Sequence, residues 1–338
     1  MNFKEIPRVY LANLPTPFEE APRLARKIGL SKLFFKRDDL TGLAGGGNKA
    51  RKLEYDLAEV IRGGYDVVIT VGGIQSNHAR MTAAACRKLG IDIKLVLGGP
   101  DFTIPQGNLL LDALFGAEIR YLVDDDANDN LTSAMEKWAD ELIQIGRKPF
   151  IIPIGGSTGL GAIGYVKAMQ ELSEQFGNEK VQIILGVGSC GTVAGVILGC
   201  GIFMPNARVI GVSVSRTVEA IKQRTREIIH ESASLVDYKV NVNDLSIECY
   251  DDYHIEYGMM TKSGELAISE CANLEGILLD PIYTGKVMAG LIDLARKKII
   301  DKNIPVIFIH TGGMPIIFSF ASELGAKINC TKIYKQVR

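Results

Sequence analysis

The chain has 338 residues, of which 47% are hydrophobic and 23% are charged, and its formal net charge is −1. This length allows two domains or one large α/β domain, and the composition is ordinary for a soluble globular enzyme or binding protein. The near-neutral charge gives no electrostatic reason to expect nucleic acid or an anionic membrane as a partner.

Features that would indicate secretion, a membrane span or a metal site are missing from the sequence. Residues 1–17 carry acid and proline where a signal peptide would need an apolar core. The best apolar run, VQIILGVG at 181–188, has the length of a strand. The cysteines are widely scattered without a CxxC pair, at positions 86, 190, 200, 249, 271 and 330. We therefore expect a cytoplasmic protein with neither a disulfide framework nor a zinc site.

Short β-branched runs alternate with longer helical patterns along most of the chain. In chain order, the predicted strands are 66–73, 92–99, 118–123, 149–156, 181–188, 207–214 and 305–313. The predicted helices between them are 77–90, 106–117, 131–146 and 162–177. Strands this apolar, each followed by a helix, are typical of parallel sheets covered on both faces. The sequence therefore predicts a doubly wound α/β fold.

Glycines gather where the predicted strands end. They are Gly72-Gly73, Gly98-Gly99, Gly155-Gly156, Gly186 with Gly188, and Gly312-Gly313. Open α/β sheets bind ligands at the carboxyl edge of their strands, where loops meet helix N-termini. Some of these glycines are tight turns, but five clusters at one edge favour a ligand site.

Two glycine motifs resemble nucleotide-binding loops, and each lacks an essential part. In GLAGGGNK, residues 42–49, Asn48 precedes Lys49, and Ala50 replaces the hydroxyl residue of a Walker A loop. The segment 186–191 matches G-x-G-x-x-G, but the next strand ends in GVSVSRT without the acid that would hold a ribose. An NAD-dependent oxidoreductase is therefore a disfavoured alternative, and a non-enzymatic binding protein is a third class.

The same segment, GVGSCGTVAG at 186–195, can instead form a cup for a single phosphate at a helix N-terminus. Such a cup suits pyridoxal phosphate, which also needs a lysine for its Schiff base. Lys49 is a candidate, because an amine in a glycine-lined loop at a helix start can be desolvated and kept near neutral. The ordinary interpretation of a single lysine is a solvated surface charge.

Five motifs carry a family resemblance. In order they are KRDDLTGLAGGGNKARKLEY (36–55), GGIQSNHAR (72–80), GSCGT (188–192), LLDPIYTGKVMAGLIDL (278–294) and IFIHTGG (307–313). Together they closely resemble the fold-type II pyridoxal-phosphate enzymes that include 1-aminocyclopropane-1-carboxylate deaminase and D-cysteine desulfhydrase. The resemblance spans nearly the whole chain. It implies a tryptophan-synthase-β-like fold with two doubly wound parallel or mixed sheets.

The resemblance implies roles for residues that bind the cofactor. Lys49 would form the Schiff base, Lys52 would be directed at the phosphate, and Asn77 would hydrogen-bond the phenolic oxygen. Thr311 would also bind the cofactor and Thr284 the substrate, and which of the two contacts the pyridine nitrogen stays open. The phosphate cup would comprise Gly188, Ser189, Cys190, Gly191 and Thr192. Cys190 departs from the family's glycine, which leaves the local backbone conformation open.

The resemblance also implies residues around the substrate. Ser76 would lie near the substrate Cα and carboxylate, and Asn77 would also contact the substrate. Taken alone, the pair is more typical of a helix N-cap after a strand, and the two roles are compatible. His78 would line the carboxylate pocket, with a helix-surface histidine as the alternative. Tyr283 resembles the family tyrosine that takes part in proton transfer, and Tyr257 resembles a second pocket tyrosine.

Two positions bear on the reaction. Cyclopropane-opening deaminases carry an acid where this chain has Thr284 and an apolar residue where it has Thr311. A threonine hydroxyl can hydrogen-bond to an unprotonated pyridine nitrogen, a weaker electron sink that suffices when a good leaving group is on Cβ. The resemblance therefore implies α,β-elimination, with D-cysteine giving pyruvate, sulfide and ammonia, and with Lys49, Ser76 or Tyr283 as the base.

Alternatives stay open within the family. They are an L-cysteate sulfo-lyase, an L-cysteine desulfhydrase, a diaminopropionate-processing enzyme and, less favoured, a 1-aminocyclopropane-1-carboxylate deaminase. The resemblance further implies a large domain of residues 1–49 and 164–338 and a small domain of residues 50–163. The cofactor would lie in the cleft between them, and the protein would be a homodimer.

Overall fold

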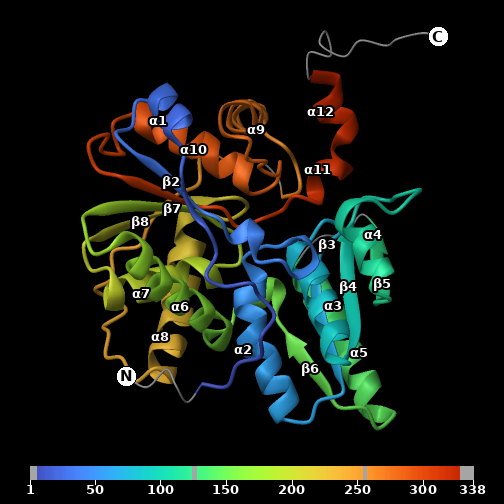
Figure 1. Ribbon diagram of the computed structural model, residues 1–338. Coiled ribbons are helices and arrows are strands. Elements are labelled where there is room, and N and C mark those ends of the chain that lie inside the picture. The colour runs from blue at the N-terminus through green and yellow to red at the C-terminus, as the bar shows by residue number, and fades with distance from the viewer. Residues whose placement is uncertain (1–5, 124–127, 254–256, 328–338) are drawn as a thin grey trace, which may run out of the picture.

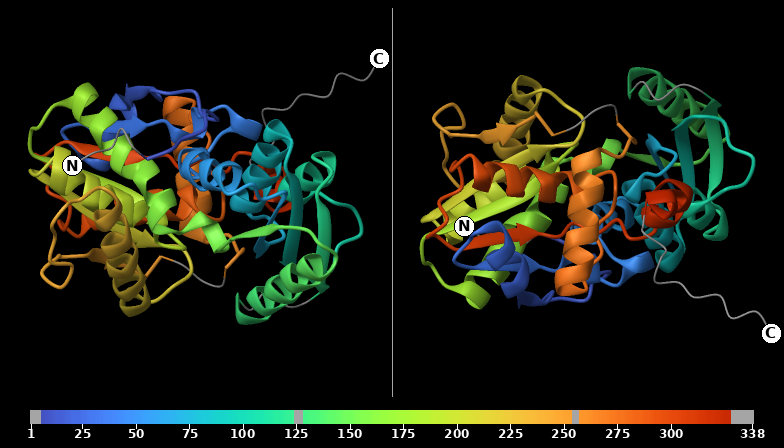
Figure 2. Two further views of the ribbon diagram at one scale, coloured as in Figure 1. Left: turned by 90° about the horizontal axis from the view of Figure 1, so that it is seen from below. Right: turned by 90° about the horizontal axis from the view of Figure 1, so that it is seen from above.

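The computed structural model describes residues 6–123, 128–253 and 257–327, within which the strands form two separate sheets (Figure 1). Six strands make one sheet and four make the other. The two sheets lie on opposite sides of the molecule in every ribbon view (Figures 1 and 2).

The six-stranded sheet combines an N-terminal segment with the second half of the chain. Its first strand pair is antiparallel and its other pairings are parallel. In spatial order the strands are β1 (Phe18–Glu20), β2 (Leu33–Lys36), β10 (Val306–Ile309), β7 (Val181–Val187), β8 (Ala207–Ser213) and β9 (Glu248–Tyr250).

Helices cover both faces of this sheet. Alternate side chains of β7 point to opposite faces, so Ile183 and Leu185 join one hydrophobic cluster and Ile184 joins another. The first cluster is closed by α6 (Gly159–Phe176), α7 (Gly191–Phe203) and α8 (Val218–Leu235). The second is closed by α1 (Pro22–Ile28), α9 (Lys262–Glu275) and α10 (Thr284–Arg296).

The four-stranded sheet is parallel throughout and is also covered on both faces. Its order is β5 (Glu118–Val123), β4 (Asp92–Gly99), β3 (Val67–Gly73) and β6 (Pro149–Ile152). One face packs against α2 (Lys49–Arg62) and α3 (Asn77–Leu89), which α4 (Gly107–Leu114) flanks; the other packs against α5 (Asn128–Gln144). The predicted α/β fold with two doubly wound, mostly parallel sheets is confirmed.

Helix α2 joins the two halves, because it packs against both α6 and α3. The expected domain borders, at 49/50 and 163/164, fall at the start of α2 and within α6. The division into domains at those residues stays a prediction.

A buried ion network fixes α2 to the six-stranded sheet. Both nitrogens on one edge of the Arg51 guanidinium donate to the Asp38 carboxylate at 2.9 Å, and Arg51 also donates to Glu171 on α6 at 2.9 and 3.0 Å. Lys36 on β2 pairs with Glu171, and the Tyr165 hydroxyl donates to Asp38. Such bidentate pairs constrain geometry as well as charge, so the helix that begins at Lys49 has a fixed position.

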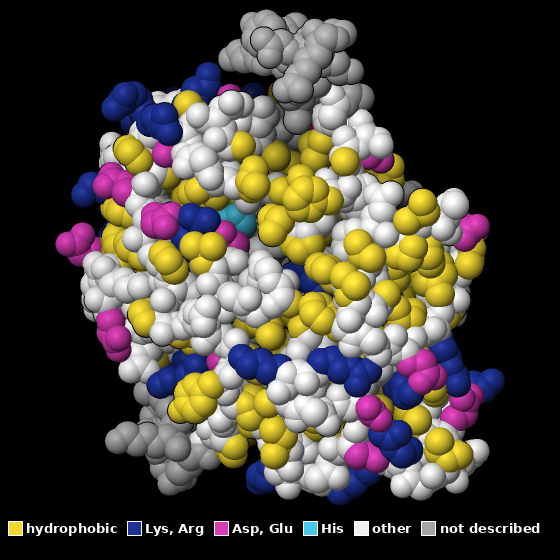
Figure 3. Space-filling view, turned by 45° about the vertical axis from the view of Figure 1, so that its right-hand side comes forward, with side chains coloured by type: hydrophobic (Ala, Val, Ile, Leu, Met, Phe, Trp, Pro, Cys, Tyr) yellow, Lys and Arg dark blue, Asp and Glu magenta, His cyan; other side chains and the backbone are white. Residues whose placement is uncertain are grey.

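The chain ends its described part with two short helices, α11 (Ile316–Ser319) and α12 (Ala321–Lys327). Helix α11 contacts α4. Leu110 and Leu114 on α4 and Phe318 on α11 are exposed apolar side chains. Figure 3 shows apolar side chains gathered on this face of the molecule.

All five cysteines in the described ranges are free thiols, namely Cys86, Cys190, Cys200, Cys249 and Cys271. Cys330 lies outside the described residues. No helix in the described part of the chain has the length and apolar character needed to cross a membrane.

Candidate active site

A cavity of about 350 Å³ opens between the two sheets, at the carboxyl ends of their strands. Residues that follow β3, β7, β8 and β10 contribute to its wall, together with the start of α2 and of α3. This is the edge at which the glycine clusters were expected to form a ligand site. The volume is in the range of small-molecule pockets.

Two positions in the glycine loop before α2 leave little or no room for a side chain. Gly46 has φ +79°, and a Cβ there would lie 1.8 Å from the carbonyl oxygen of Asp39. Gly47 has φ +138° and forms an isolated bridge with Gly312, which follows β10. The loop therefore presses against neighbouring main chain and delivers Lys49 to the cavity.

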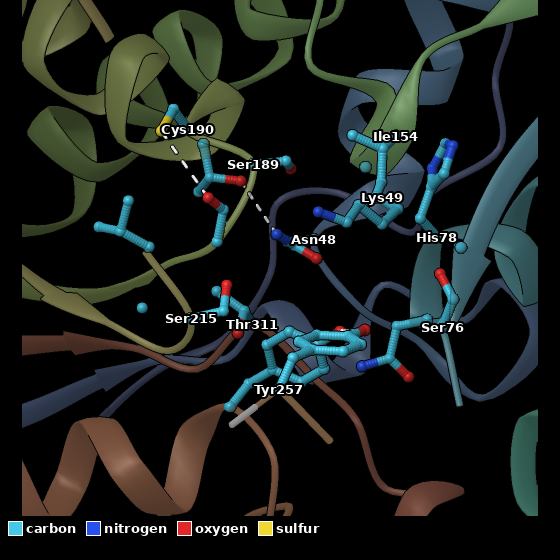
Figure 4. Close-up of a pocket in the computed structure, with 18 of the residues that line it drawn as sticks. Asn48, Lys49, Ser76, His78, Ile154, Ser189, Cys190, Ser215, Tyr257 and Thr311 are labelled. Carbon is cyan, nitrogen blue, oxygen red and sulfur yellow. Dashed lines mark hydrogen bonds between the residues drawn. The ribbon is translucent and has the colours of Figure 1, made fainter. Parts of the chain in front are cut away.

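Lys49 is the first residue of α2 and lines the cavity. Burial lowers the pKa of its amine to about 8, so a large share of the amine is neutral and nucleophilic near that pH. Figure 4 shows the Lys49 amine directed toward Asn48 and Ser189. The preceding Asn48 donates to the Thr192 hydroxyl at 3.0 Å, which ties the lysine loop to the predicted phosphate cup.

The predicted cup, Gly188–Thr192, connects β7 to the N-terminus of α7. Gly188, Ser189, Cys190 and Thr192 line the cavity, whereas the N–H of Gly191 donates to the Ser157 hydroxyl at 3.1 Å. Cys190 has a left-handed backbone conformation, with φ +72°, which glycine adopts freely. The N-terminus of α7 supplies N–H groups that can bind an anion.

Lys52 lies behind this cup and is fully buried. Its ammonium donates to the Gly155 carbonyl at 2.7 Å and to the Ser157 hydroxyl at 3.1 Å. A Cβ on Gly191 would lie only 2.6 Å from the Lys52 nitrogen, so the amine is directly against the cup. Burial lowers the pKa of Lys52 well below its ordinary value, and repulsion from Lys49 adds to the effect. An anion in the cup would offset both effects.

Ser76 and Asn77 both line the cavity at the N-terminus of α3. The Ser76 oxygen accepts the N–H of Ala79 at 3.2 Å, as an N-cap does. Because that bond uses only the oxygen, the hydroxyl proton is available to a ligand. Ser76 can therefore cap α3 and still donate a hydrogen bond to a ligand in the cavity.

His78 is buried in the cavity wall, so the alternative of a helix-surface histidine is wrong. The Thr70 hydroxyl donates to the Ile152 carbonyl at 2.7 Å, so the His78 Nε2, 2.9 Å away, must be the donor to Thr70. Burial, reinforced by Lys49 and Lys52, lowers the pKa of His78 well below its ordinary value. His78 is thus a neutral, fixed wall of the cavity.

The two predicted tyrosines meet on the opposite wall. Tyr257 and Tyr283 line the cavity, and their hydroxyl oxygens are 2.6 Å apart. Figure 4 places the Tyr257 ring across the cavity from Ser189. Burial, together with Tyr257, raises the pKa of Tyr283 well above its ordinary value.

The two threonines have different surroundings. Thr311 lines the cavity, and its carbonyl accepts the N–H of Asn48 at 3.0 Å. Thr284 is buried outside the cavity wall, where its hydroxyl donates to the Asp280 carboxylate and accepts the Asp280 N–H, both at 2.7 Å. The structure therefore brings Thr311, but not Thr284, to the cavity.

Sequence reasoning missed several residues of the wall. Ser215 and Arg216 follow β8 and enter the cavity, as do Leu131 and Ile154 from the four-stranded half. The position of Ser215 and Arg216 after a predicted strand at the glycine-rich edge was an available signal. Leu131 and Ile154 gave none, because they look like ordinary core residues. Among the described residues that line the cavity, none is an aspartate or glutamate.

These groups fit a phosphorylated aldehyde cofactor. A partly neutral amine at Lys49 can bond to a carbonyl carbon, and a helix N-terminus with Lys52 behind it can hold a phosphate. The dinucleotide alternative lacks its ribose acid here as well, because β8 ends at Ser213, whose hydroxyl bonds the main chain of Arg216.

Comparison with known proteins agrees with this fit. Residues 9–312 match the family described as "Pyridoxal-phosphate dependent enzyme". A D-cysteine desulfhydrase from Klebsiella pneumoniae is 40% identical over 332 residues, covering 96% of this chain and 99% of the relative. A Pyrococcus horikoshii protein, provisionally named 1-aminocyclopropane-1-carboxylate deaminase, is 42% identical over 95% of this chain and 96% of its own.

Solved structures show the same relationship. The structure titled as an analysis of the ACC deaminase homologue superposes with a TM-score of 0.89 at 41% identity, covering 95% of this chain and 96% of the other. A diaminopropionate ammonia lyase from Escherichia coli shares the fold alone, with a TM-score of 0.67 at 18% identity over 94% of this chain and 88% of its own. The NAD-dependent alternative is therefore wrong. The chain belongs to the pyridoxal-phosphate-dependent enzymes of fold type II, in the group that contains 1-aminocyclopropane-1-carboxylate deaminase and D-cysteine desulfhydrase.

Proposed function

We propose that the protein catalyses α,β-elimination on a sulfur-containing amino acid, with D-cysteine as the substrate and pyruvate, sulfide and ammonia as the products. The observation that carries this proposal is the absence of a carboxylate among the described residues of the cavity wall. None of the described wall residues would therefore keep the pyridine nitrogen of the cofactor protonated. A weaker electron sink suits a reaction that expels a good leaving group.

Thr311 supports the same proposal. It is the threonine that reaches the cavity, so its hydroxyl is the one available to hydrogen-bond a neutral pyridine nitrogen. The hydroxyl of Thr284 is held by Asp280 instead. Thr284 therefore acts on the site through the backbone at the start of α10, beside Tyr283.

The remaining residues of the wall have these roles in the proposal. Pyridoxal phosphate, when bound, supplies the electron sink for a carbanion at the substrate Cα. Lys49 would hold the cofactor, and the NH₂ group of Asn77 would bind its phenolic oxygen. The N-terminus of α3, with Ser76, would bind the substrate carboxylate. Tyr283 holds a proton near the reacting atoms, since its raised pKa keeps the hydroxyl protonated at neutral pH.

The first test concerns the cofactor link. Purified protein should absorb at roughly 410–420 nm, the range of lysine-bound pyridoxal phosphate. Lys49→Ala should remove the lysine-linked band and turnover. Full activity in that variant would overturn the assignment of Lys49. Lys167→Ala, which changes a lysine on α6 outside the cavity wall, is the matched control and should keep both.

The second test separates the candidate substrates. The protein is incubated with D-cysteine, L-cysteine, L-cysteate and 1-aminocyclopropane-1-carboxylate, and pyruvate, 2-oxobutyrate, sulfide and sulfite are measured. We expect pyruvate and sulfide from D-cysteine at the highest kcat/KM. A different fastest reaction would overturn the proposal. Sulfite from L-cysteate would indicate a sulfo-lyase, sulfide from L-cysteine an L-cysteine desulfhydrase, and 2-oxobutyrate from the cyclopropane amino acid a deaminase.

We also propose that the protein is a homodimer, as its family resemblance implies. The exposed apolar side chains on α4 and α11 are compatible with further association. Sedimentation velocity of the holoenzyme should give a mass near twice the 36.8 kDa of one chain. A mass near 36.8 kDa at micromolar concentration would contradict it.

A further inference from the structure

The side-chain oxygen of Asn77 is fully occupied on the side away from the cavity. It accepts a hydrogen bond from the Asn108 amide nitrogen at 2.9 Å and another from the Arg80 guanidinium at 3.2 Å. An amide oxygen has two acceptor positions, and an arginine can only donate. The amide of Asn77 is therefore oriented with its oxygen toward Arg80 and Asn108, and its NH₂ group is left to face the cavity.

The orientation of Asn108 is equally determined. Its amide nitrogen also donates to the Gln75 main-chain carbonyl at 2.8 Å, an atom that can only accept. Its main-chain N–H donates to the Gln75 side-chain oxygen at 2.8 Å. Asn108 is fully buried near the start of α4. Both N–H bonds of its amide are used, one on the main chain before α3 and one on Asn77.

We propose that Asn108 is a positioning residue that fixes Asn77 with its NH₂ group toward the phenolic oxygen of the cofactor. This inference rests on the proposed role of Asn77 as the ligand of that oxygen. The phenolic oxygen carries negative charge and accepts hydrogen bonds, so a rotated Asn77 would present an oxygen to it and repel it. Asn108 has no place in the cavity wall, and it reaches the wall through its hydrogen bonds to Asn77 and to Gln75.

Arg80 shares the task but is a poor test of it. Its guanidinium also donates to the main-chain carbonyls of Ala44 and Gly46 in the glycine loop before Lys49. Substituting Arg80 would therefore disturb the lysine loop and Asn77 together. Asn108 contacts the site through Asn77 and the adjoining Gln75, so it isolates the effect.

The test is a double-mutant cycle on cofactor binding. The dissociation constant of pyridoxal phosphate is measured by absorbance and fluorescence for apo protein carrying Asn77→Ala, Asn108→Ala, or both. We expect Asn108→Ala to weaken binding about five- to tenfold, as for the loss of one buried hydrogen bond. In the Asn77→Ala background the same substitution should change binding less than twofold. Asn206→Ala, at an exposed asparagine remote from the cavity, is the control and should have no effect.

A second variant preserves the size of the side chain. Asn108→Asp replaces the donor by an acceptor, so it should weaken cofactor binding more than Asn108→Ala and shift the visible band of the bound cofactor. Circular dichroism confirms that each variant is folded. An equal loss from Asn108→Ala in both backgrounds, or no loss in either, would overturn the positioning role. If Asn77→Ala binds the cofactor normally, the proposed role of Asn77 fails as well. The assignment of Lys49 is tested separately, by the visible band of lysine-bound pyridoxal phosphate.

Discussion

The hydroxyl oxygens of Tyr257 and Tyr283 lie 2.6 Å apart on the cavity wall. One of the two hydroxyls donates in this bond and the other accepts. Because burial and Tyr257 raise the pKa of Tyr283 well above its ordinary value, Tyr283 keeps its proton at neutral pH. The Tyr283 oxygen is therefore not a ready phenolate, and it stays hydrogen-bonded to Tyr257.

Removing the Tyr283 hydroxyl should separate chemistry from cofactor binding. We expect Tyr283→Phe to lower kcat by about 10²-fold or more, the range for loss of a positioned proton donor, with the cofactor band unchanged. Tyr253→Phe is the control, because the Tyr253 hydroxyl donates to Asp293, outside the cavity wall. It should stay within twofold of the native kcat. Native turnover by Tyr283→Phe would exclude the hydroxyl from the reaction.

The lowered pKa of Lys49 predicts how cofactor loading depends on pH. An amine attacks a carbonyl carbon only when deprotonated, so the neutral fraction rises with pH and reaches one half at the pKa. For Lys49 that value is about 8. The rate at which apo protein forms the visible band with pyridoxal phosphate should rise from pH 6 and be half-maximal near pH 8. A midpoint near 10, that of a solvated lysine, would contradict the desolvated environment.

Two substitutions of Cys190 should affect stability differently. Its φ of +72° is a conformation that glycine adopts freely and β-branched residues avoid. Cys190→Gly should change the free energy of unfolding by less than about 1 kcal/mol, because relief of strain offsets the greater entropy of the unfolded chain. Cys190→Val should cost about 1–2 kcal/mol more and weaken cofactor binding. Urea denaturation measures both, and equal effects would show that the conformation is unstrained.

The ion network beneath α2 predicts a large effect at one arginine and a small effect at another on the same helix. Arg51→Met would leave Asp38 buried without its guanidinium, which should cost about 3–5 kcal/mol of unfolding free energy. Arg62→Met removes an exposed pair with Glu59 and should cost less than about 1 kcal/mol. Similar losses in the two variants would mean that Arg51 contributes no more than a surface charge.

The same network predicts sensitivity to acid. Burial alone would raise the pKa of Asp38 and of Glu171, but the Arg51 guanidinium outweighs it and lowers both. Depressed carboxyl pKa values stabilise the folded state above the unfolded values near 4, and this stability is lost as the pH falls toward the folded values. Unfolding free energy should therefore drop below about pH 4, and Arg51→Met should flatten that drop.

Much of the fold could be predicted because its strands are short and strongly apolar. The predicted strand at 118–123 coincides with β5, and that at 92–99 with β4. The strand expected at 149–156 ends at Ile152, because Pro153 cannot donate to the ladder and Gly155 turns with φ +70°. The short edge strands β1 and β9, of three residues each, were missed, since their pairing depends on neighbours distant in sequence.

Residues of the candidate site could be predicted where they belong to a sequence motif. Residues that are placed there only by packing between distant segments could not. The glycine loop indicated Lys49, and the family resemblance implied Lys52, which lies three residues further along the same helix. The commitment of Thr284 to Asp280 was hidden, because four residues of sequence separation do not reveal which hydroxyl faces a cavity. Asn108 was hidden for a similar reason: it reaches Asn77 from another helix, 31 residues along the chain.

Helix α2 is braced on one side by the charges of Arg51 and on the other by apolar packing against α3. Its first residue, Lys49, lies between the cup after β7 and the start of α3 and lines the cavity. The position of one reactive nitrogen is therefore set jointly by contacts from both halves of the chain, so damage to either side of α2 would misplace it relative to the cup.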